Sequence, residues 1–329
     1  MSQIGTQPIA EPQAPDFGLP AAAVLGRSPW ELFWRRFRQD RVALVGLGFI
    51  VVLMLVAISA PLIARFVVHH GPNELNNNLV DAIGLPAVGP SKAYWLGVDT
   101  VGRDVFVRTI YGARTSLIVA FVATGLAVTL GIVLGTLAGF FGGWVDTLVS
   151  RTIDVVLSLP VLLLALGISA ACSITAEGCL GGLIQPGVPL VVMLIALFSW
   201  PYIARIVRGQ VLSLREKEFV EAARSEGFTN LGIMFREILP NLAASIIVYT
   251  TLIIPSNIIF EASLSFLGIG IPFTTASWGR MISEAARGQL YTVAWWMLMA
   301  PGVALVLTTL AFNLVGDGLR DALDPRTGG

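Results

Sequence analysis

The sequence predicts an all-α integral membrane protein with six transmembrane helices and with the N- and C-termini in the cytoplasm. Of the 329 residues, 55% are hydrophobic and 13% are charged, whereas a soluble domain has about 25% charged residues. About 20 helical residues cross the hydrocarbon core of a bilayer, and a backbone in lipid must satisfy its own hydrogen bonds. Runs of that length without Asp, Glu, Lys or Arg are 42–64, 115–143, 155–176, 178–204, 238–260 and 290–316. So many uncharged runs disfavour the alternative, the buried helices of a large soluble protein.

Residues 1–41 are predicted to form a cytoplasmic leader. The stretch up to Arg27 is rich in Pro, Ala and Gln, a composition typical of segments without fixed structure. Aromatic residues then alternate with arginines, which favours a short amphipathic helix on the membrane surface. A plain basic anchor beside the first span explains the pattern equally well. Either way, a cytoplasmic N-terminus is indicated by Arg35, Arg36, Arg38 and Arg41.

Beyond the leader, the runs divide the chain into a first transmembrane helix (42–64), an outer loop (65–110), a five-helix core (111–320) and a cytoplasmic tail (321–329). Within the core, segment 205–240 is expected to be a cytoplasmic loop. It holds the densest group of basic residues after the leader, in agreement with the orientation inferred from the first span.

Glycines recur at four-residue spacing in the second run, at Gly131, Gly135, Gly139 and Gly143. Small residues at this spacing share one face of a helix and let another helix approach closely in lipid. Tight packing within the bundle is the main interpretation, and a sliding surface for a moving helix is the alternative.

Cys172 and Cys179 fall in the predicted outer loop between the third and fourth runs. A disulfide is plausible if that loop faces an oxidising compartment, and two free thiols at a helix end are the alternative. His69 and His70 are adjacent and have no third ligand near them in the sequence, so surface residues are favoured over a metal site.

No run carries a charged residue near its middle, which weakens a mechanism coupled to protons or sodium. A phosphate-binding loop needs Gly-Lys followed by Ser or Thr, but Lys92 follows Ser91 and Lys217 follows Glu216. We therefore expect no ATP, Mg²⁺ or other cofactor on this chain and no enzymatic activity of its own. Zero net charge gives no reason to expect nucleic-acid binding.

The segment from Ser213 to Asn241 is the most informative. Ser213 and Glu216 have capping-box spacing, which predicts a helix start there, and Gly227 is a natural stop because glycine adopts positive φ. Thr229 or Asn230 is expected to cap a second helix, and Pro240 to begin the fifth span. Two short helices joined by a tight turn form a compact projection suited to docking on a partner.

Six residues of this segment carry a resemblance to a known family. Glu221, Ala222, Ala223, Gly227, Ile238 and Pro240 resemble the EAA loop of binding-protein-dependent ABC importer permeases. Segments 96–104, 111–117, 261–268 and 277–281 resemble the C-type permease of dipeptide, oligopeptide and nickel importers. Val98 and Val101 depart from its pattern, since Thr and Leu are more frequent there. The resemblance covers roughly residues 35–324.

The resemblance implies a type I ABC importer transmembrane fold, in which two homologous permeases enclose a path across the bilayer. The EAA loop would seat in a groove of an ATPase, with Glu221 on the ATPase surface and Gly227 shaping the turn. The implied partners are a second permease subunit, two ATP-binding subunits that carry ATP and Mg²⁺, an extracytoplasmic substrate-binding protein and the lipid bilayer. Candidates for an outer gate region are Asp99, Gly102, Arg103 and Asp104.

The cargo implied is dipeptides or oligopeptides moved inward across the bacterial inner membrane. Alternatives are the same importer with nickel, glutathione or an oligosaccharide as cargo, or a stand-alone secondary transporter. A membrane enzyme would need a polar catalytic cluster, which the sequence does not indicate.

Overall fold

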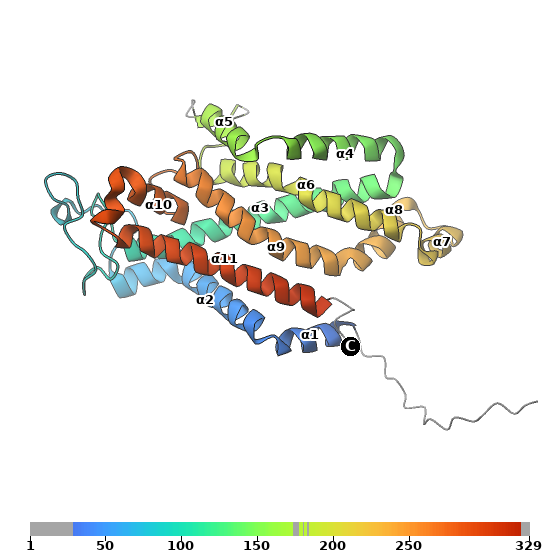
Figure 1. Cartoon of the computed structure of the whole chain (residues 1–329), viewed down its shortest axis with the longest axis horizontal. Coiled ribbons are helices and arrows are strands. Elements are labelled where there is room, and N and C mark those ends of the chain that lie inside the picture. The colour runs from blue at the N-terminus through green and yellow to red at the C-terminus, as the bar shows by residue number, and fades with distance from the viewer. Residues whose placement is uncertain (1–28, 174–177, 180, 183, 324–329) are drawn as a thin grey trace, which may run out of the picture.

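The computed structural model describes residues 29–173, 178–179, 181–182 and 184–323. The leader segment predicted to lack structure and most of the predicted tail lie outside these residues. Helices account for most of what is described (Figure 1). Their bounds are α1 (Pro29–Gln39), α2 (Arg41–Ile63), η1 (Ala64–Val68), η2 (Asn77–Leu79), α3 (Val105–Phe141), α4 (Gly143–Ser158), α5 (Val161–Ser173), α6 (Val188–Leu214), α7 (Glu218–Ser225), α8 (Asn230–Ile233), η3 (Met234–Ile238), α9 (Leu239–Phe266), α10 (Trp278–Ala286), η4 (Arg287–Thr292) and α11 (Trp296–Leu323).

Five helical stretches among the described residues are long and apolar enough to cross a membrane: 41–68, 105–141, 188–214, 230–266 and 296–323. The pair α4 and α5 makes a sixth when taken together, although the two helices meet at a bend of 86°. The predicted all-helical membrane fold is therefore confirmed, and its sixth candidate span is interrupted by this bend.

The broken span corrects the prediction of a continuous run over 155–176. Leu159 is extended, with φ −84° and ψ 144°, because a residue before proline is pushed out of the helical region. Pro160 thus separates α4 from α5. The fourth span also starts later than predicted, at Val188, directly after Gly187 with φ 105°.

The centre of the bundle is the contact between α3 and α6. A Cβ added at Gly131 would lie 2.6 Å from Ile203 Cβ, and one at Gly135 would lie 2.6 Å from the Ala204 carbonyl oxygen. Gly139 approaches Val211 in the same way. Small residues therefore let the two backbones meet, as the packing interpretation expects.

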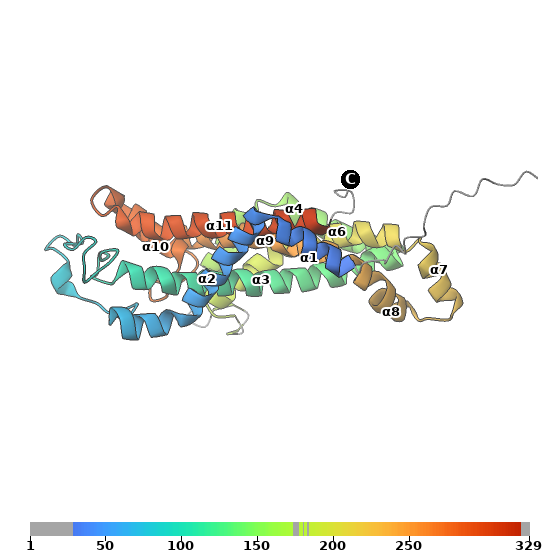
Figure 2. The same ribbon diagram turned by 90° about the horizontal axis from the view of Figure 1, so that it is seen from below.

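The remaining helices surround this pair. Helix α2 lies along α3 and α11, and α9 packs against α3, α6 and α11. Figure 2 shows α1 and α2 on one side of the bundle, with α7 and α8 projecting from one end. The loops before α3 lie at the opposite end together with α10 (Figure 1).

Helix α3 begins inside the segment assigned above to the outer loop (65–110). Asp104 is its N-cap, and the Asp104 carboxylate accepts a hydrogen bond from the Val107 amide at 3.1 Å. The capping side chain starts the helix at Val105, although charged residues continue to Arg114.

Candidate functional site

Helices α7 and α8 project from the end of the bundle that the sequence predicts to face the cytoplasm. Ser213 does not cap α7, contrary to the prediction, because α6 continues through Leu214. Lys217 is the N-cap, with φ −84° and ψ 149° and no side-chain capping bond. The first turn of α7 instead contains Glu218 and Glu221, whose negative charges favour a helix N-terminus.

The two sides of α7 have different surroundings. Val220 and Ala223 are buried in a cluster with Val211, Ile233 and Ile238. Glu221 and Ala222 point outward and are exposed. Within the motif Glu221-Ala222-Ala223, the second alanine therefore anchors the helix, while the glutamate and the first alanine are open to a partner.

The turn after α7 has the geometry expected from its residues. Gly227 has φ 85°, a region that glycine adopts without steric cost. The Thr229 hydroxyl accepts a hydrogen bond from the Gly232 amide at 3.2 Å and caps α8. Ile238 is fully buried, and Pro240 lies in the first turn of α9. Buried contacts thus hold the projection to the bundle at both ends.

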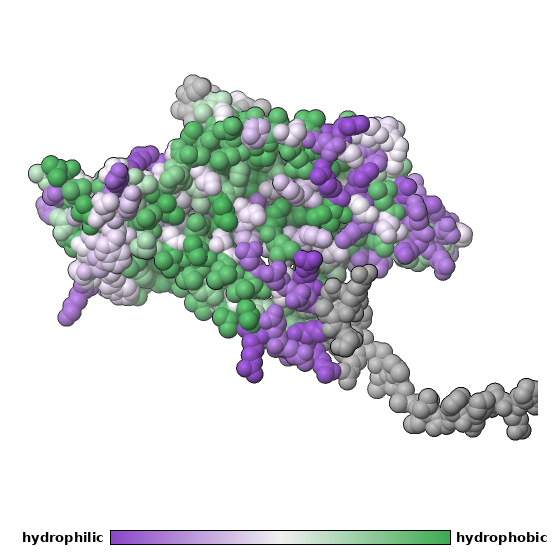
Figure 3. Space-filling view, viewed as in Figure 1, coloured by the Kyte–Doolittle hydropathy of each residue, from purple (hydrophilic) through white to green (hydrophobic). Residues whose placement is uncertain are grey.

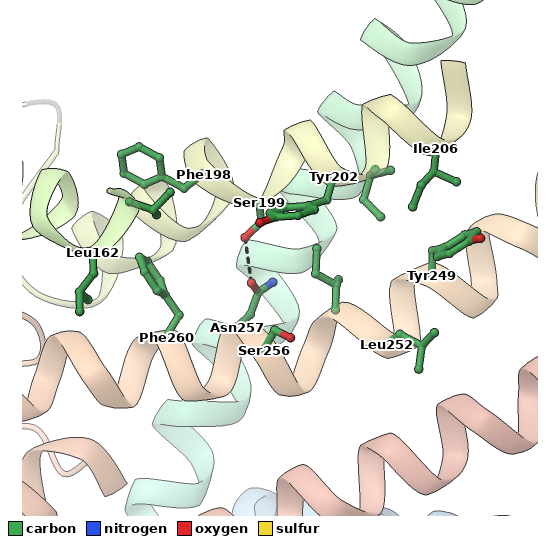
Figure 4. A pocket seen from close by; sticks show the side chains of 13 residues that line it. Leu162, Phe198, Ser199, Tyr202, Ile206, Tyr249, Leu252, Ser256, Asn257 and Phe260 are labelled. Carbon is green, nitrogen blue, oxygen red and sulfur yellow. Dashed lines mark hydrogen bonds between the residues drawn. The ribbon is translucent and has the colours of Figure 1, made fainter. Parts of the chain in front are cut away.

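A cavity of about 630 Å³ lies between α5, α6 and α9, within the range of small-molecule sites. Figure 4 shows residues of α6 facing residues of α9 across it, including Tyr202 and Tyr249. Tyr202 is 58% exposed, so the cavity opens on the side of the bundle. In the described part of the chain, no charged side chain lines it. We call it the groove.

A short polar chain crosses the wall of the groove. The Ser199 hydroxyl donates to Asn257 Oδ1 at 2.9 Å (Figure 4), and Asn257 Nδ2 donates to the Thr124 hydroxyl at 2.7 Å. Asn257 is 2% exposed, and these bonds hold its amide in place. The sequence did not indicate this group, because its members come from three different apolar runs.

The opposite end of the bundle, where the loops before α3 lie, contains a buried ion-pair cluster. Arg103 donates from Nε to Asp99 Oδ2 at 2.6 Å and from Nη2 to Glu284 Oε2 at 3.0 Å. Arg108 lies 3.7 Å from both carboxylates, and Arg280 Nε lies 3.3 Å from Glu284 Oε1. The cluster joins the start of α3 to α10.

Two of the predicted outer residues, Asp99 and Arg103, belong to this cluster. The Arg103 guanidinium also lies 4.1 Å from the centroid of the Phe273 ring, a cation–π contact. Gly102 and Asp104 lie beside the cluster: Gly102 has φ 77° and packs against the Asn76 backbone. The sequence did not point to Glu284 or Arg280 as their partners, since these are far along the chain.

Asp104 has one satisfied and one unsatisfied oxygen. Its Oδ2 is buried without a hydrogen-bond partner among the described residues. Burial raises the pKa of Asp104, and the backbone hydrogen bonds from Val107 and Phe106 oppose the shift, as does nearby His70. Folding therefore favours the protonated carboxyl.

A further acidic residue lies inside α9, at Glu261. It is fully buried, and it accepts hydrogen bonds from the Ser116 hydroxyl at 2.9 Å and the Ser265 hydroxyl at 2.8 Å. Ser277, the N-cap of α10, hydrogen bonds to the same carboxyl. The uncharged run ended at Phe260, so the sequence placed Glu261 just outside the membrane helix that contains it.

Gly143 does not share the packing face of Gly131, Gly135 and Gly139. It is the first residue of α4, has φ 55°, and a Cβ there would meet nothing within 4 Å. With Gly142 at φ 65° it forms the turn between α3 and α4, so its role is conformational.

The cysteines and histidines have separate roles. Cys172 at the end of α5 is bonded to Cys179, with 4.8 Å between the Cα atoms. His70 stacks on the Tyr94 ring at 4.8 Å between centroids, and His69 is exposed. Across the described ranges, no group of three or more His, Cys, Asp or Glu side chains is arranged to hold a metal ion.

Comparison with known proteins identifies similar chains. A family model described as "Binding-protein-dependent transport system inner membrane component" matches residues 131–329, and one described as "N-terminal TM domain of oligopeptide transport permease C" matches residues 28–82. The "Glutathione transport system permease protein GsiD" of Escherichia coli O6:K15:H31 (strain 536 / UPEC) is 40% identical over 305 residues, which are 92% of each chain. The protein of the same name from Shigella boydii serotype 4 (strain Sb227) has the same identity and coverage.

A solved structure is also similar, "Inward facing conformations of the MetNI methionine ABC transporter: CY5 native crystal form". The TM-score is 0.52 at 16% sequence identity, covering 67% of this chain and 97% of that chain. At this identity the likeness concerns the fold alone.

Proposed function

We propose a cargo, a path and a set of partners from one premise: the chain belongs to the family of binding-protein-dependent transport system inner membrane components. It is therefore a permease subunit of an ABC importer and a multi-pass inner membrane protein. Members of this family work within a transport complex and are not themselves enzymes.

The observation that carries the proposal is the projection α7–α8. Its inner side is buried in the bundle, while Glu221 and Ala222 are exposed. An ATP-binding subunit that contacts this surface moves the bundle rather than the projection alone, because Ala223 and Ile238 are packed against α3 and α6. ATP and Mg²⁺ bind to two such subunits, and this chain needs no cofactor.

The groove is proposed to be the half of the transport path that this subunit contributes. Its exposed Tyr202 and its opening toward the side of the bundle fit closure by a second, homologous permease. An uncharged lining with tyrosine, serine and asparagine groups offers weak contacts to peptide-like solutes without trapping either of their charged ends. Such weak contacts suit a path from which the cargo must also leave.

The cargo proposed is a dipeptide, an oligopeptide or a peptide-like solute such as glutathione, itself a tripeptide. The relatives named for glutathione transport support this class. An extracytoplasmic binding protein delivers the cargo to the outer loops, where the Asp99–Arg103–Glu284 cluster holds α10 against the segment just before α3.

The test of the coupling surface is Glu221→Lys or Gly227→Pro in the assembled complex, reconstituted in liposomes. Both variants should lose substrate-stimulated ATP hydrolysis and transport, because one reverses the exposed charge and the other cannot adopt φ 85°. Asp317→Lys is the matched control, since Asp317 is an exposed carboxylate of α11 outside the projection. Normal transport by both coupling variants, or equal loss in the control, overturns the proposal.

The test of the cargo uses the same liposomes loaded with ATP. Uptake of a labelled dipeptide and of glutathione is compared with uptake of Ni²⁺ and of a trisaccharide, each with the cognate binding protein. Peptide uptake alone is the expected result. Uptake of nickel or sugar instead would contradict the proposed cargo but not the proposed coupling surface. Uptake without ATP-binding subunits would indicate a secondary transporter.

A further inference from the structure

Helix α1 is fixed to the bundle on one side. Phe33 and Phe37 are 8% and 2% exposed, and they pack in a cluster with Ala43 and with Ala322 of α11. Gly318 of α11 lies against Phe37, and a Cβ there would be 3.0 Å from Asp40 Oδ2. The direction in which the opposite side of α1 faces is therefore set by packing.

That opposite side is basic and aromatic. Trp34 is 51% exposed, and Arg35 and Arg38 are exposed on the same helix. Arg41, the first residue of α2, is exposed as well. The Arg38 guanidinium lies 5.8 Å from the centroid of the Trp34 ring. Within the described residues no carboxylate lies within ion-pair distance of these three arginines. We call these four residues the basic collar.

The basic collar lies at the boundary of the apolar surface. Arg41 is the first residue of α2, and Val42, Val45 and Val52 after it are 57%, 72% and 58% exposed. Figure 3 shows hydrophilic side chains over α1 beside a hydrophobic surface over α2 and α11. The lipid-facing side of α2 thus begins where the arginines end, which places them at the depth of headgroups in the cytoplasmic leaflet.

We propose that the basic collar binds the phosphate of an anionic glycerophospholipid in the cytoplasmic leaflet. Guanidinium groups match phosphate oxygens with two parallel hydrogen bonds. The Trp34 ring has an apolar body and a polar N–H, a combination enriched at this depth of a membrane. An arginine run that only orients the first span needs no fixed geometry, whereas here the helix carrying it is packed on α11.

The bound lipid contacts two elements, α1 and the first turn of α2. Both are held to the end of α11 through Phe37, Ala43 and Gly318. Since the lipid binds the folded arrangement, it should also stabilise the junction of these helices.

The experiment is a lipid titration of the full-length chain, purified with its partner subunits in detergent and followed by native mass spectrometry. Phosphatidylglycerol, which is anionic, is compared with zwitterionic phosphatidylcholine carrying the same acyl chains, so that the two lipids differ in the headgroup alone. The preference for phosphatidylglycerol should fall about 100-fold in the variant Arg35→Gln/Arg38→Gln/Arg41→Gln, from about fivefold per arginine near a membrane surface.

The matched control is Arg65→Gln/Lys92→Gln/Arg114→Gln, which removes three exposed charges at the outer end and should keep the preference. If the collar triple does not insert in the native orientation, Arg38→Gln alone retains two of the three charges and should lose about fivefold. An unchanged preference in the collar variant, or an equal loss in the control, overturns the proposal. The proposal is also overturned if a partner subunit covers these arginines, because an acidic protein surface would then occupy the basic collar in place of a lipid.

Discussion

Asp104 shows how one side chain combines a favourable and an unfavourable contact. Its Oδ1 accepts from the Val107 amide and caps α3, while its buried Oδ2 has no partner among the described residues. The cap is worth about 1 kcal/mol, whereas an ionised, uncompensated oxygen costs free energy in the folded state. The same residue therefore starts the helix and opposes its own ionisation.

Asp104→Asn should be at least as stable as the native chain at pH 7. The pKa of Asp104 is raised by burial, so the stabilisation from its protonated form is complete below the unfolded pKa near 3.9. It is lost as pH rises through the folded pKa. Asparagine keeps the capping oxygen and does not titrate, so the melting temperature should change less between pH 4 and pH 7.

Thermal unfolding of the purified chain at several pH values provides the measurement. Asp104→Ala, which removes the cap as well, should lose about 1 kcal/mol. A steeper pH dependence in Asp104→Asn than in the native chain contradicts the interpretation.

Glu261 is a buried acceptor shared by three elements of the bundle. Hydroxyls from Ser116, Ser265 and Ser277 converge on it, and these residues belong to α3, α9 and the cap of α10. Glu261→Ala leaves these hydroxyls buried without their acceptor, at about 1–3 kcal/mol for each unsatisfied group. Glu261→Gln keeps one acceptor oxygen and the size of the side chain.

The melting temperature in detergent should therefore fall by several degrees in Glu261→Ala and by much less in Glu261→Gln. Because the Glu261 carboxyl links the Ser277 cap of α10 to Ser116 of α3 and Ser265 of α9, proteolysis between α9 and α10 should accelerate in the alanine variant as well. An equal loss in both variants means that the charge, rather than the hydrogen-bond geometry, stabilises this site.

At the scale of elements, the contact between α3 and α6 determines the shape of the bundle. Gly135 lies on this contact, and a Cβ added to it would be 2.6 Å from a backbone oxygen of α6. Backbone cannot move aside as a flexible side chain does. Gly135→Ala should therefore cost about 1–3 kcal/mol through overpacking.

Gly125 provides the matched control on the same helix, since it is exposed and a Cβ there would meet nothing within 4 Å. Gly125→Ala should unfold at or slightly above the native temperature. The two variants differ in packing but share the same change in helix propensity, so a comparable loss in both contradicts the close-approach interpretation.

The existence of the helices could be predicted from the sequence more readily than their ends. Runs without charge identified the spans, but α6 continues ten residues past Ala204. Arg208 is tolerated there because it pairs with Asp146 of α4, with Nη2 2.7 Å from Oδ2, and Arg205 pairs with Asp154 at 2.9 Å. Such partners are contributed by another helix and leave no local pattern.

The same distinction between local sequence patterns and contacts from distant helices applies to the candidate site. The projection α7–α8 depends on residues close in sequence, so the motif and Gly227 could indicate it in advance. The groove depends on Thr124, Ser199 and Asn257, each an unremarkable residue in its own run. Only the folded bundle brings them together.

At the scale of the whole molecule, polar features are separated along the long axis. The basic collar and the projection α7–α8 lie toward one end, and the Asp99–Arg103–Glu284 cluster lies toward the other (Figure 1). Between them, the face seen in Figure 3 is largely hydrophobic. The groove lies between α5, α6 and α9. If it is a transport path it should be accessible to water, whereas a crevice filled with lipid should not be.

Thiol labelling measures that accessibility. The two native cysteines are bonded to each other, so the labelling of this chain reports only on the introduced cysteine. Tyr202→Cys should react with a charged, membrane-impermeant thiosulfonate, because the thiolate that reacts forms in water and not in hydrocarbon. Val133→Cys is the control: it is 50% exposed on α3 and lies at a similar depth, since the neighbouring Gly131 contacts Ile203.

A large difference in rate is expected, with Tyr202→Cys reacting and Val133→Cys protected by lipid. Trapping the ATP-binding subunits in one state should then change the rate at position 202, because a path that opens alternately to each side changes its access to water. Equal rates at both positions indicate that lipid fills the groove. In that case the path lies elsewhere in the complex, while the surface formed by Glu221 and Ala222 remains available to the proposed ATP-binding subunits.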